Sequence, residues 1–217
     1  MGDVLLAWVP RGEAGELEAN LSDAYGPRGL QVFRGGGQQA ARRSVSAGGA
    51  VVTLTEDHYF EYDVQLEGIS IVDHLELWQE LTGFMSHAQA GGEFKFKLDG
   101  AEARDHTTSA AAAAGATVLE LVTAAGWIAG DKVYIEDVDD PTKWQVSTVG
   151  SKQTSPPELQ GMAPPLFYSY GLGSVVRSWE YFPKCVAQDG DPTLEEREAG
   201  RGANLWDFRL RFRTVRS

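Results

Sequence analysis

Hydrophobic and polar residues alternate along several stretches of this chain, as in strands with one buried face. Between residues 51 and 68, Phe60, Tyr62, Val64 and Leu66 fall on one face, and acidic and amide side chains fall on the other. The segment LWDFRLRFRTV at 205–215 shows the same alternation, with aromatic residues and leucine opposite a row of arginines. These patterns predict long strands that cover a core.

The period changes after Gly68. Apolar residues then recur at spacings of three and four, which predicts an amphipathic helix within 70–89. The residues on this expected apolar stripe are Ile71, Leu75, Trp78, Leu81, Met85 and Ala88. Ser70 is the expected N-cap with Asp73 as its reciprocal acid, and Gly91 and Gly92 are expected to end the helix. The strand EFKFKLD follows directly.

The composition changes again after residue 100. Residues 101–116 include a run of alanines without periodicity, which we interpret as a linker or a mobile excursion of the chain. Three short strand patterns follow, TVLELV, KVYIED and WQVSTV, separated by turns rich in Gly, Asp and Pro. Residues 151–165 hold four of the nine prolines and predict an extended connector.

These elements predict a mainly β protein, a β-sandwich with one flanking α-helix and a small inserted β domain. Residues 1–100 form the first part of the sandwich, with the flanking helix at 70–89. Residues 101–155 form the inserted β domain. Residues 156–217 form a connector and the closing strands of the sandwich.

The arginine row near the C-terminus has two interpretations. Arg209, Arg211 and Arg213 share one face of the predicted last strand. They could be the charged decoration of an edge strand, which blocks aggregation. Alternatively, they could contact the acidic surface of a neighbouring copy, because guanidinium groups pair well with carboxylates.

The charge of the chain narrows the possible partners. Lys and Arg number 19 against 31 Asp and Glu, a net charge of −12, which argues against nucleic-acid binding. The apolar stretch near the N-terminus spans roughly seven residues, too few for a signal or a membrane span. We therefore expect neither nucleic acid nor membrane as a partner. The single cysteine, Cys185, is expected to be a buried small hydrophobe.

The segment GDKVYIEDVDDPTKWQVSTVG at 130–150 is rich in carboxylates. Its spacing does not fit a calcium loop of the EF-hand type, because Pro141 and Thr148 occupy ligand positions. Glu136 and Asp137 should point to opposite sides of a strand, which disfavours a catalytic pair. Asp139 and Asp140 before a proline are typical of a hairpin turn. We predict a solvated turn.

The sequence contains no motif typical of a metal site, a catalytic nucleophile or a phosphate-binding loop. The four histidines, His58, His74, His87 and His106, form no metal-binding motif. Ser174 lies in no nucleophile elbow, and Gly35–Gly37 lack the lysine of a phosphate-binding loop. We predict no catalytic, cofactor-binding or metal site. Arg42 and Arg43 follow these glycines and are expected in an N-terminal loop that is flexible or binds a partner.

The order of elements resembles a known family. A strand, the helix in GISIVDHLELWQELTGFMSHA, the strand in GGEFKFKLD and the final strand LWDFRLRFRTV resemble structural tail proteins of long-tailed bacteriophages, of the distal-tail and tail-tube families. The inserted segment GATVLELVTAAGWIAGDKVYIEDVDDPTKWQVSTV resembles the small β insertions of phage virion proteins. The likeness covers about half of the chain.

This resemblance implies a structural protein of the virion tail, at the tail tip or neck, made in the host cytoplasm. It implies a ring-shaped homo-oligomer, expected to be hexameric, which contacts other phage tail proteins and catalyses nothing. Ring closure repeats one contact between unlike surfaces. The expected interface residues are Arg42, Arg43, Asp139, Asp140, Arg209, Arg211 and Arg213.

Two other functions remain open at this point. The chain could be a carbohydrate-binding β-sandwich module, whose aromatic platforms would be Trp127, Trp144, Trp179 and Tyr181. It could also be an enzyme that uses the acidic cluster of Asp189, Asp191, Glu195 and Glu196. That cluster is more typical of a solvated loop or a short helix.

Overall fold

The computed structural model describes residues 4–12, 14–22, 30–34, 38–45, 51–98, 104–188, 190–197 and 205–215. For 33–34, 38–45, 51–59 and 197, it describes the backbone alone. The chain divides into two compact units. Unit 1 consists of Met1–Gly100 with Phe182–Ser217, and unit 2 is Ala101–Tyr181. Both are built mainly from antiparallel strands, so the predicted fold class, mainly β with one helix, is confirmed for the described residues.

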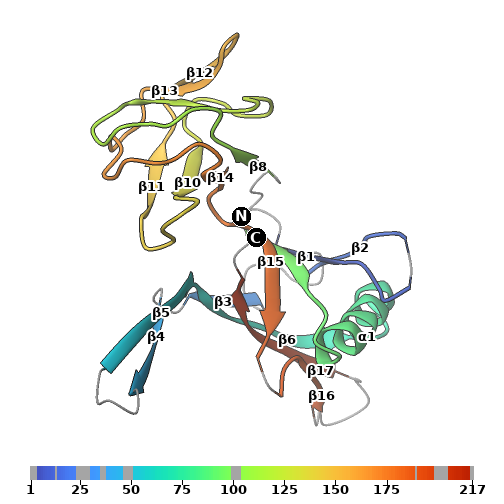
Figure 1. The fold of residues 1–217 in the computed structure, drawn as a ribbon. Coiled ribbons are helices and arrows are strands. Elements are labelled where there is room, and N and C mark those ends of the chain that lie inside the picture. The colour runs from blue at the N-terminus through green and yellow to red at the C-terminus, as the bar shows by residue number, and fades with distance from the viewer. Residues whose placement is uncertain are drawn as a thin grey trace. The chain divides into compact units, whose positions relative to one another are not determined.

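Unit 1 contains an 8-stranded antiparallel sheet with the order β2-β1-β7-β15-β17-β6-β3, and β16 also pairs with β17 (Figure 1). The strands are β1 (Leu5–Trp8), β2 (Leu17–Asn20), β3 (Leu30–Arg34), β6 (Glu61–Ser70), β7 (Phe94–Lys97), β15 (Tyr181–Ala187), β16 (Thr193–Arg197) and β17 (Leu205–Thr214). One long side of β17 pairs with β6, and the other pairs with β15 and β16. β17 is therefore a central strand, and its interpretation as an edge strand is wrong.

Aromatic side chains fill the core of unit 1. Phe212 on β17 lies 4.7 Å from Phe96 on β7, between ring centroids, and 5.3 Å from both Tyr62 on β6 and Phe94 on β7. Phe182 on β15 lies 5.1 Å from Tyr62. The predicted alternation is confirmed here, because Phe60, Tyr62, Val64, Leu66, Phe94, Phe96, Phe208, Leu210 and Phe212 are all buried.

The helix α1 (Leu75–Gln89) packs on this core through Leu77, Leu81, Phe84 and Ala88. The ring of Phe84 lies 5.0 Å from Phe94 and 5.3 Å from Trp8, so the helix covers the face formed by β7 and β1. The predicted helix at 70–89 starts five residues too early. Residues 71–73 form a turn, in which the hydroxyl of Ser70 accepts the N–H of Asp73 at 3.3 Å.

The predicted apolar stripe of the helix is also partly wrong. Leu81 and Ala88 are buried as expected, whereas Leu75 is exposed. Leu77 and Phe84 take the buried positions, because the spacing 77, 81, 84 and 88 follows one face of the helix as it begins at Leu75. The turn at 71–73 carries Ile71 outside the helix.

The strands β4 (Gln38–Val45) and β5 (Val51–Tyr59) pair with each other in a separate two-stranded sheet. β5 runs into β6 through Phe60, and β3 pairs with β6, so the hairpin continues the edge of the large sheet. Arg42 and Arg43 therefore lie on a strand, not in the loop expected from the sequence. Their side chains lie outside the described part of the structure.

Unit 2 consists of a 4-stranded sheet, β11-β10-β14-β8, and a 3-stranded sheet, β12-β13-β9 (Figure 1). Its strands are β8 (Asp105–Thr107), β9 (Val118–Glu120), β10 (Lys132–Glu136), β11 (Trp144–Thr148), β12 (Ser151–Thr154), β13 (Pro157–Gln160) and β14 (Val175–Ser178). The core between them contains Leu119, Leu121, Trp127, Val133, Ile135, Val149, Leu159, Met162, Leu166, Tyr170 and Val176.

Unit 2 is larger than the predicted insertion at 101–155. The expected linker contributes β8 and a bridge from Ala112 to Tyr170. The expected connector at 151–165 forms the hairpin of β12 and β13 instead. Residues 156–181 belong to unit 2, because Leu159, Tyr170 and Val176 complete its core. Proline content suggests an extended segment, but a hairpin accepts proline in its turn and at the first residue of a strand, where Pro156 and Pro157 lie.

The core of unit 1 predicts a large effect at Phe212. We expect Phe212→Ala to lower the free energy of unfolding by about 3–5 kcal/mol, because it leaves a cavity among Tyr62, Phe94 and Phe96. Urea unfolding followed by circular dichroism measures this. The control is Val72→Ala, whose side chain is 86% exposed and should change stability by less than about 0.5 kcal/mol. Equal effects of the two substitutions would contradict the assignment of the core.

Candidate functional site

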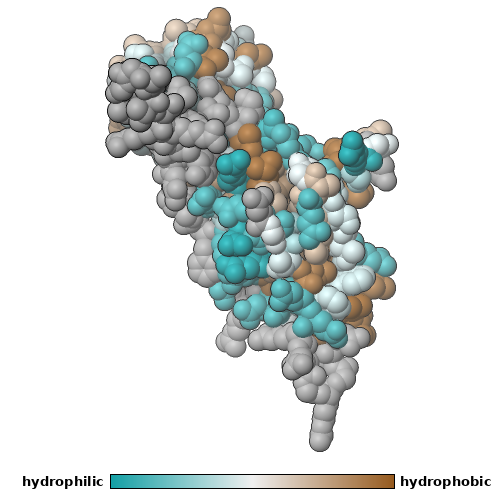
Figure 2. Space-filling view, turned by 60° about the horizontal axis from the view of Figure 1, so that its bottom comes forward, coloured by the Kyte–Doolittle hydropathy of each residue, from teal (hydrophilic) through white to brown (hydrophobic). Residues whose placement is uncertain are grey.

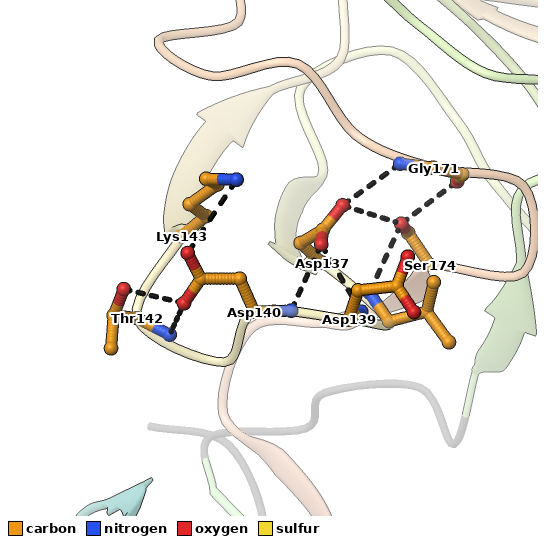
Figure 3. A network of polar contacts seen from close by, with 8 residues as sticks. Asp137, Asp139, Asp140, Thr142, Lys143, Gly171 and Ser174 are labelled. Atoms are coloured by element: carbon orange, nitrogen blue, oxygen red, sulfur yellow. Dashed lines mark hydrogen bonds and ion pairs between the residues drawn. The ribbon is translucent and has the colours of Figure 1, made fainter. Parts of the chain in front are cut away.

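Asp137 joins two loops of unit 2, the turn between β10 and β11 and the loop before β14 (Figure 3). Its buried carboxylate accepts the N–H groups of Asp139 at 3.1 Å and Asp140 at 3.0 Å through Oδ1. Through Oδ2 it accepts the N–H of Gly171 at 2.8 Å and the hydroxyl of Ser174 at 3.4 Å. One side chain thus holds the tip of a hairpin against a loop more than 30 residues away in sequence.

Burial alone would raise the pKa of Asp137, because it disfavours the charged form. The hydrogen bonds from the N–H groups of Gly171, Asp139 and Asp140 outweigh burial and lower the pKa below its ordinary value. The carboxylate is therefore ionised at neutral pH, with its oxygens occupied by donors from the same chain. Such a group acts as an anchor of the backbone.

The rest of the acidic turn is held by its own side chains (Figure 3). Asp140 Oδ1 accepts the N–H of Thr142 at 3.1 Å and its hydroxyl at 2.6 Å, and Asp140 Oδ2 lies 3.5 Å from the ammonium of Lys143. The bonds from Thr142 lower the pKa of Asp140. The prediction of a turn is confirmed, although Asp137 is buried and not solvated. Glu136 accepts the hydroxyl of Tyr134 at 2.5 Å.

The loop before β14 is also anchored to β11 and to the segment that follows β8. Phe167 donates its N–H to Oε1 of the buried Gln145 at 2.6 Å, and the hydroxyl of Tyr170 donates to the same oxygen at 3.2 Å. Ala112 and Tyr170 exchange two backbone hydrogen bonds at 2.9 Å. The backbone of this loop is therefore fixed along most of its length.

A second polar contact fixes the end of the same loop. The carbonyl of Gly171 accepts hydroxyl protons from Thr108 at 2.7 Å and from Ser174 at 2.8 Å. The N–H of Ser174 donates to Oγ1 of Thr108 at 2.9 Å. Ser174, which lies in no nucleophile elbow, therefore has a structural role between Asp137 and Gly171.

The two anchored loops expose large apolar side chains to water. Val138 is 40% exposed, Phe167 61%, Tyr168 41% and Leu172 66%. A Cβ at Gly171 would lie 3.4 Å from Cγ1 of Val138, so the hairpin tip touches the loop beside Leu172. We call Val138, Phe167, Tyr168 and Leu172 the apolar loop surface. Hydrophobic residues form separate patches between hydrophilic ones on the molecular face in Figure 2.

The apolar loop surface is absent from the sequence predictions. The segment PPLFYSYGLG was treated as part of a connector, because its prolines and glycines suggest irregular chain. The many large apolar residues in this segment could have indicated the apolar loop surface, because an exposed loop usually carries polar residues. Leu166 and Tyr170 are buried, whereas Phe167, Tyr168 and Leu172 are exposed.

The arginine row lies on the outer face of β17, opposite the aromatic core. The guanidinium of Arg209 makes two hydrogen bonds to the carboxylate of Asp63 on β6. Nε of Arg211 donates to Oδ2 of Asp191 at 2.7 Å. Arg213 pairs in register with Glu61 on β6. The row is thus matched by acids on β6 and in the segment before β16, which the sequence could not show.

The carboxylates that pair with the arginine row are less exposed to water than the arginines. The side chain of Arg209 is 48% exposed against 24% for Asp63, and that of Arg211 is 45% exposed against 2% for Asp191. The hydrogen bonds from Arg209 lower the pKa of Asp63, although burial opposes the shift. The cationic heads therefore form the outer layer of this surface.

The aromatic platforms proposed for a carbohydrate site differ in accessibility. Trp127 is fully buried in the core of unit 2, and Tyr181 is also buried. Trp144 and Trp179 are half-buried and flank Tyr134, with ring centroids 5.8 and 6.1 Å from it. The guanidinium of Arg177 lies 4.4 Å above the centroid of the Tyr134 ring. Two of the four expected platforms cannot reach a ligand.

The acidic cluster considered for an enzyme is not gathered around one point. Asp191 is buried and bonded to Arg211, whereas Glu195 and Glu196 are exposed on β16, a strand where a loop or short helix was expected. Asp189 lies outside the described residues. Within the described ranges, no group of three or more His, Cys, Asp or Glu side chains is placed to hold a metal ion.

Replacement of Asp137 should loosen the apolar loop surface. Asp137→Asn places an amide N–H against a backbone N–H, so we expect it to destabilise unit 2 by about 1–3 kcal/mol and to speed amide exchange at Gly171. Asp139→Asn is the control, because that side chain is exposed and should have an effect below about 0.5 kcal/mol. Hydrogen exchange measured by NMR tests both variants.

The pH dependence supplies an independent check on Asp137. A carboxyl whose pKa is lowered by folding stabilises the fold above its unfolded pKa of 3.8, and this contribution is lost as the pH falls through the folded pKa. The difference in stability between the native protein and Asp137→Asn should therefore shrink below pH 3.8. A difference that grows in acid would contradict the role of the ionised carboxylate.

The pair of Arg211 and Asp191 predicts a contrast within the arginine row. Arg211→Ala removes a charged donor from a buried carboxylate, and we expect a loss of about 1.5–3 kcal/mol in unfolding free energy. Arg213→Ala on the same exposed face should cost less than about 1 kcal/mol. Thermal unfolding of both variants measures the contrast, and equal losses would refute it.

Comparison with known proteins gives no family for this chain. No protein-family model matches the sequence, and no curated protein matches it. Among the described residues, no helix has both the length and the apolar character to span a membrane.

Proposed function

We propose that this chain is a structural protein of the tail of a long-tailed bacteriophage, where it assembles as a ring and contacts other tail proteins. The observation that carries the proposal is the apolar loop surface, which presents Phe167, Tyr168 and Leu172 on a backbone fixed by buried polar groups. The function of this surface is adhesion to another protein, and no chemical step is assigned to it.

Burial of the apolar loop surface against another protein is energetically favourable. Large apolar side chains in water favour burial, at about 25 cal/mol per Å² of apolar surface. A loop that is already ordered loses little conformational entropy when it binds. Hydrogen bonds with Gln145, Thr108 and Asp137 already order this loop before any partner binds. Exposed aromatic residues on such a loop are typical anchors of protein interfaces.

The architecture agrees with an assembly protein of this kind. A β core with one helix and an inserted β unit has the order of elements that resembles distal-tail and tail-tube proteins. The proposal places the protein in the virion tail after synthesis in the host cytoplasm, as a ring that is expected to be hexameric. The carbohydrate-binding alternative is weaker, because Trp127 and Tyr181 are buried.

The proposal predicts an oligomer in solution. We expect light scattering of the purified chain to give a mass several times 23.6 kDa at high protein concentration, with closed rings in electron micrographs. The mass should fall as salt is added, because charged contacts between copies are screened. A mass of one chain at all concentrations tested, with no rings, would refute the proposed ring.

A further inference from the structure

We propose that the apolar loop surface of one copy docks on the arginine row of the next copy. The inference rests on the proposed ring and names the two surfaces that form its repeating contact. The first surface is Val138, Phe167, Tyr168 and Leu172 on unit 2, with Asp139 and Asp140 at its margin. The second is the outer face of β17, with Arg209, Arg211 and Arg213.

Charge complementarity identifies a second copy as the occupant. The apolar loop surface carries a negative margin, because Asp139 and Asp140 directly follow Val138. Lys143, whose ammonium lies 3.5 Å from Asp140, offsets one of these two charges. A chain with a net charge of −12 repels its own copies unless a cationic area meets that margin. The arginine row is such an area, since its heads lie outside the carboxylates that pair with them.

Arginine side chains can also pack against the apolar residues of the loop. A guanidinium plane stacks on aromatic rings, and the rings of Phe167 and Tyr168 are exposed for this. The methylene stems of arginines offer apolar surface to side chains such as Leu172 and Val138. Because Arg209 and Arg211 are already held by Asp63 and Asp191, they lose little side-chain freedom on docking.

The two surfaces are different, so the contact is heterologous. Each copy offers one apolar loop surface and one arginine row, and the contact repeats from copy to copy until a ring closes. An isologous contact of the loop with itself would bring Asp139 and Asp140 of two copies together. The acidic margin disfavours that arrangement.

The test uses two double variants of the full chain. The loop variant, Phe167→Ser with Leu172→Ser, removes the largest exposed apolar groups of the docking loop. The row variant, Arg209→Gln with Arg213→Gln, keeps Arg211 because its partner Asp191 is buried. The control, Val122→Ser with Ile128→Ser, removes two other exposed apolar side chains of unit 2. Circular dichroism establishes that each variant is folded.

We expect the loop variant and the row variant each to associate about 100-fold or more weakly than the native chain, while the control assembles normally. An equimolar mixture of the two weakened variants should form dimers and no rings, because only the intact loop of one and the intact row of the other can meet. The mixture is studied at high protein concentration, since a single contact lacks the gain from ring closure. Light scattering measures the mass of the particles that each variant and the mixture form.

Failure of the docking contact and failure of the proposed ring give different results. If the native chain forms rings and the loop variant or the row variant forms them equally well, the docking is wrong while the ring stands. If the mixture forms no dimer, the contact is not heterologous between these surfaces, and the inference is overturned. A native chain that stays monomeric overturns the proposed ring and this contact together.

Discussion

The buried carboxylate of Asp137 is the interaction on which the apolar loop surface depends. Its two oxygens accept three backbone N–H groups, two from the hairpin tip and one from the loop before β14. The hydroxyl of Ser174 lies 3.4 Å from Oδ2 and 2.8 Å from the carbonyl of Gly171, and these two acceptors share its proton. A charge in this place is costly unless donors surround it, and the chain supplies them from its own backbone. Tethering both loops at one point lets Phe167 and Leu172 stay exposed without collapse onto the core.

Unit 2 is a support for that surface. Its core takes residues from both of its sheets, and polar contacts such as those of Gln145 with Phe167 and Tyr170 fix a loop against β11. Unit 1 is different, because aromatic rings from β6, β7, β15 and β17 fill its core and α1 covers one side. Its outer face carries the charged pairs. The chain thus carries an exposed apolar surface on unit 2 and a charged surface on unit 1.

Sequence reasoning succeeded where one periodicity dominated. The alternation in β6, β7 and β17 identified their buried faces, since each residue's side is set by the pleat alone. It failed where tertiary contacts decide the structure. The strands β12 and β13 and the bridge of Ala112 to Tyr170 were interpreted as connector and linker, and the anchored loop was missed for the same reason. No local pattern shows that Asp137 meets Gly171.

The arginine row shows why composition alone misleads about an interface. In sequence, three arginines on one strand face suggest either the charged decoration of an edge strand or a contact with the acidic surface of a neighbouring copy. In the fold, β17 is central, and Asp63 and Asp191 lie under the guanidinium groups. These acids hold the arginines in place and reduce the repulsion between them, while the heads remain half exposed. Preorganised charge of this kind favours a specific partner over nonspecific attraction, because its geometry is set before the partner arrives.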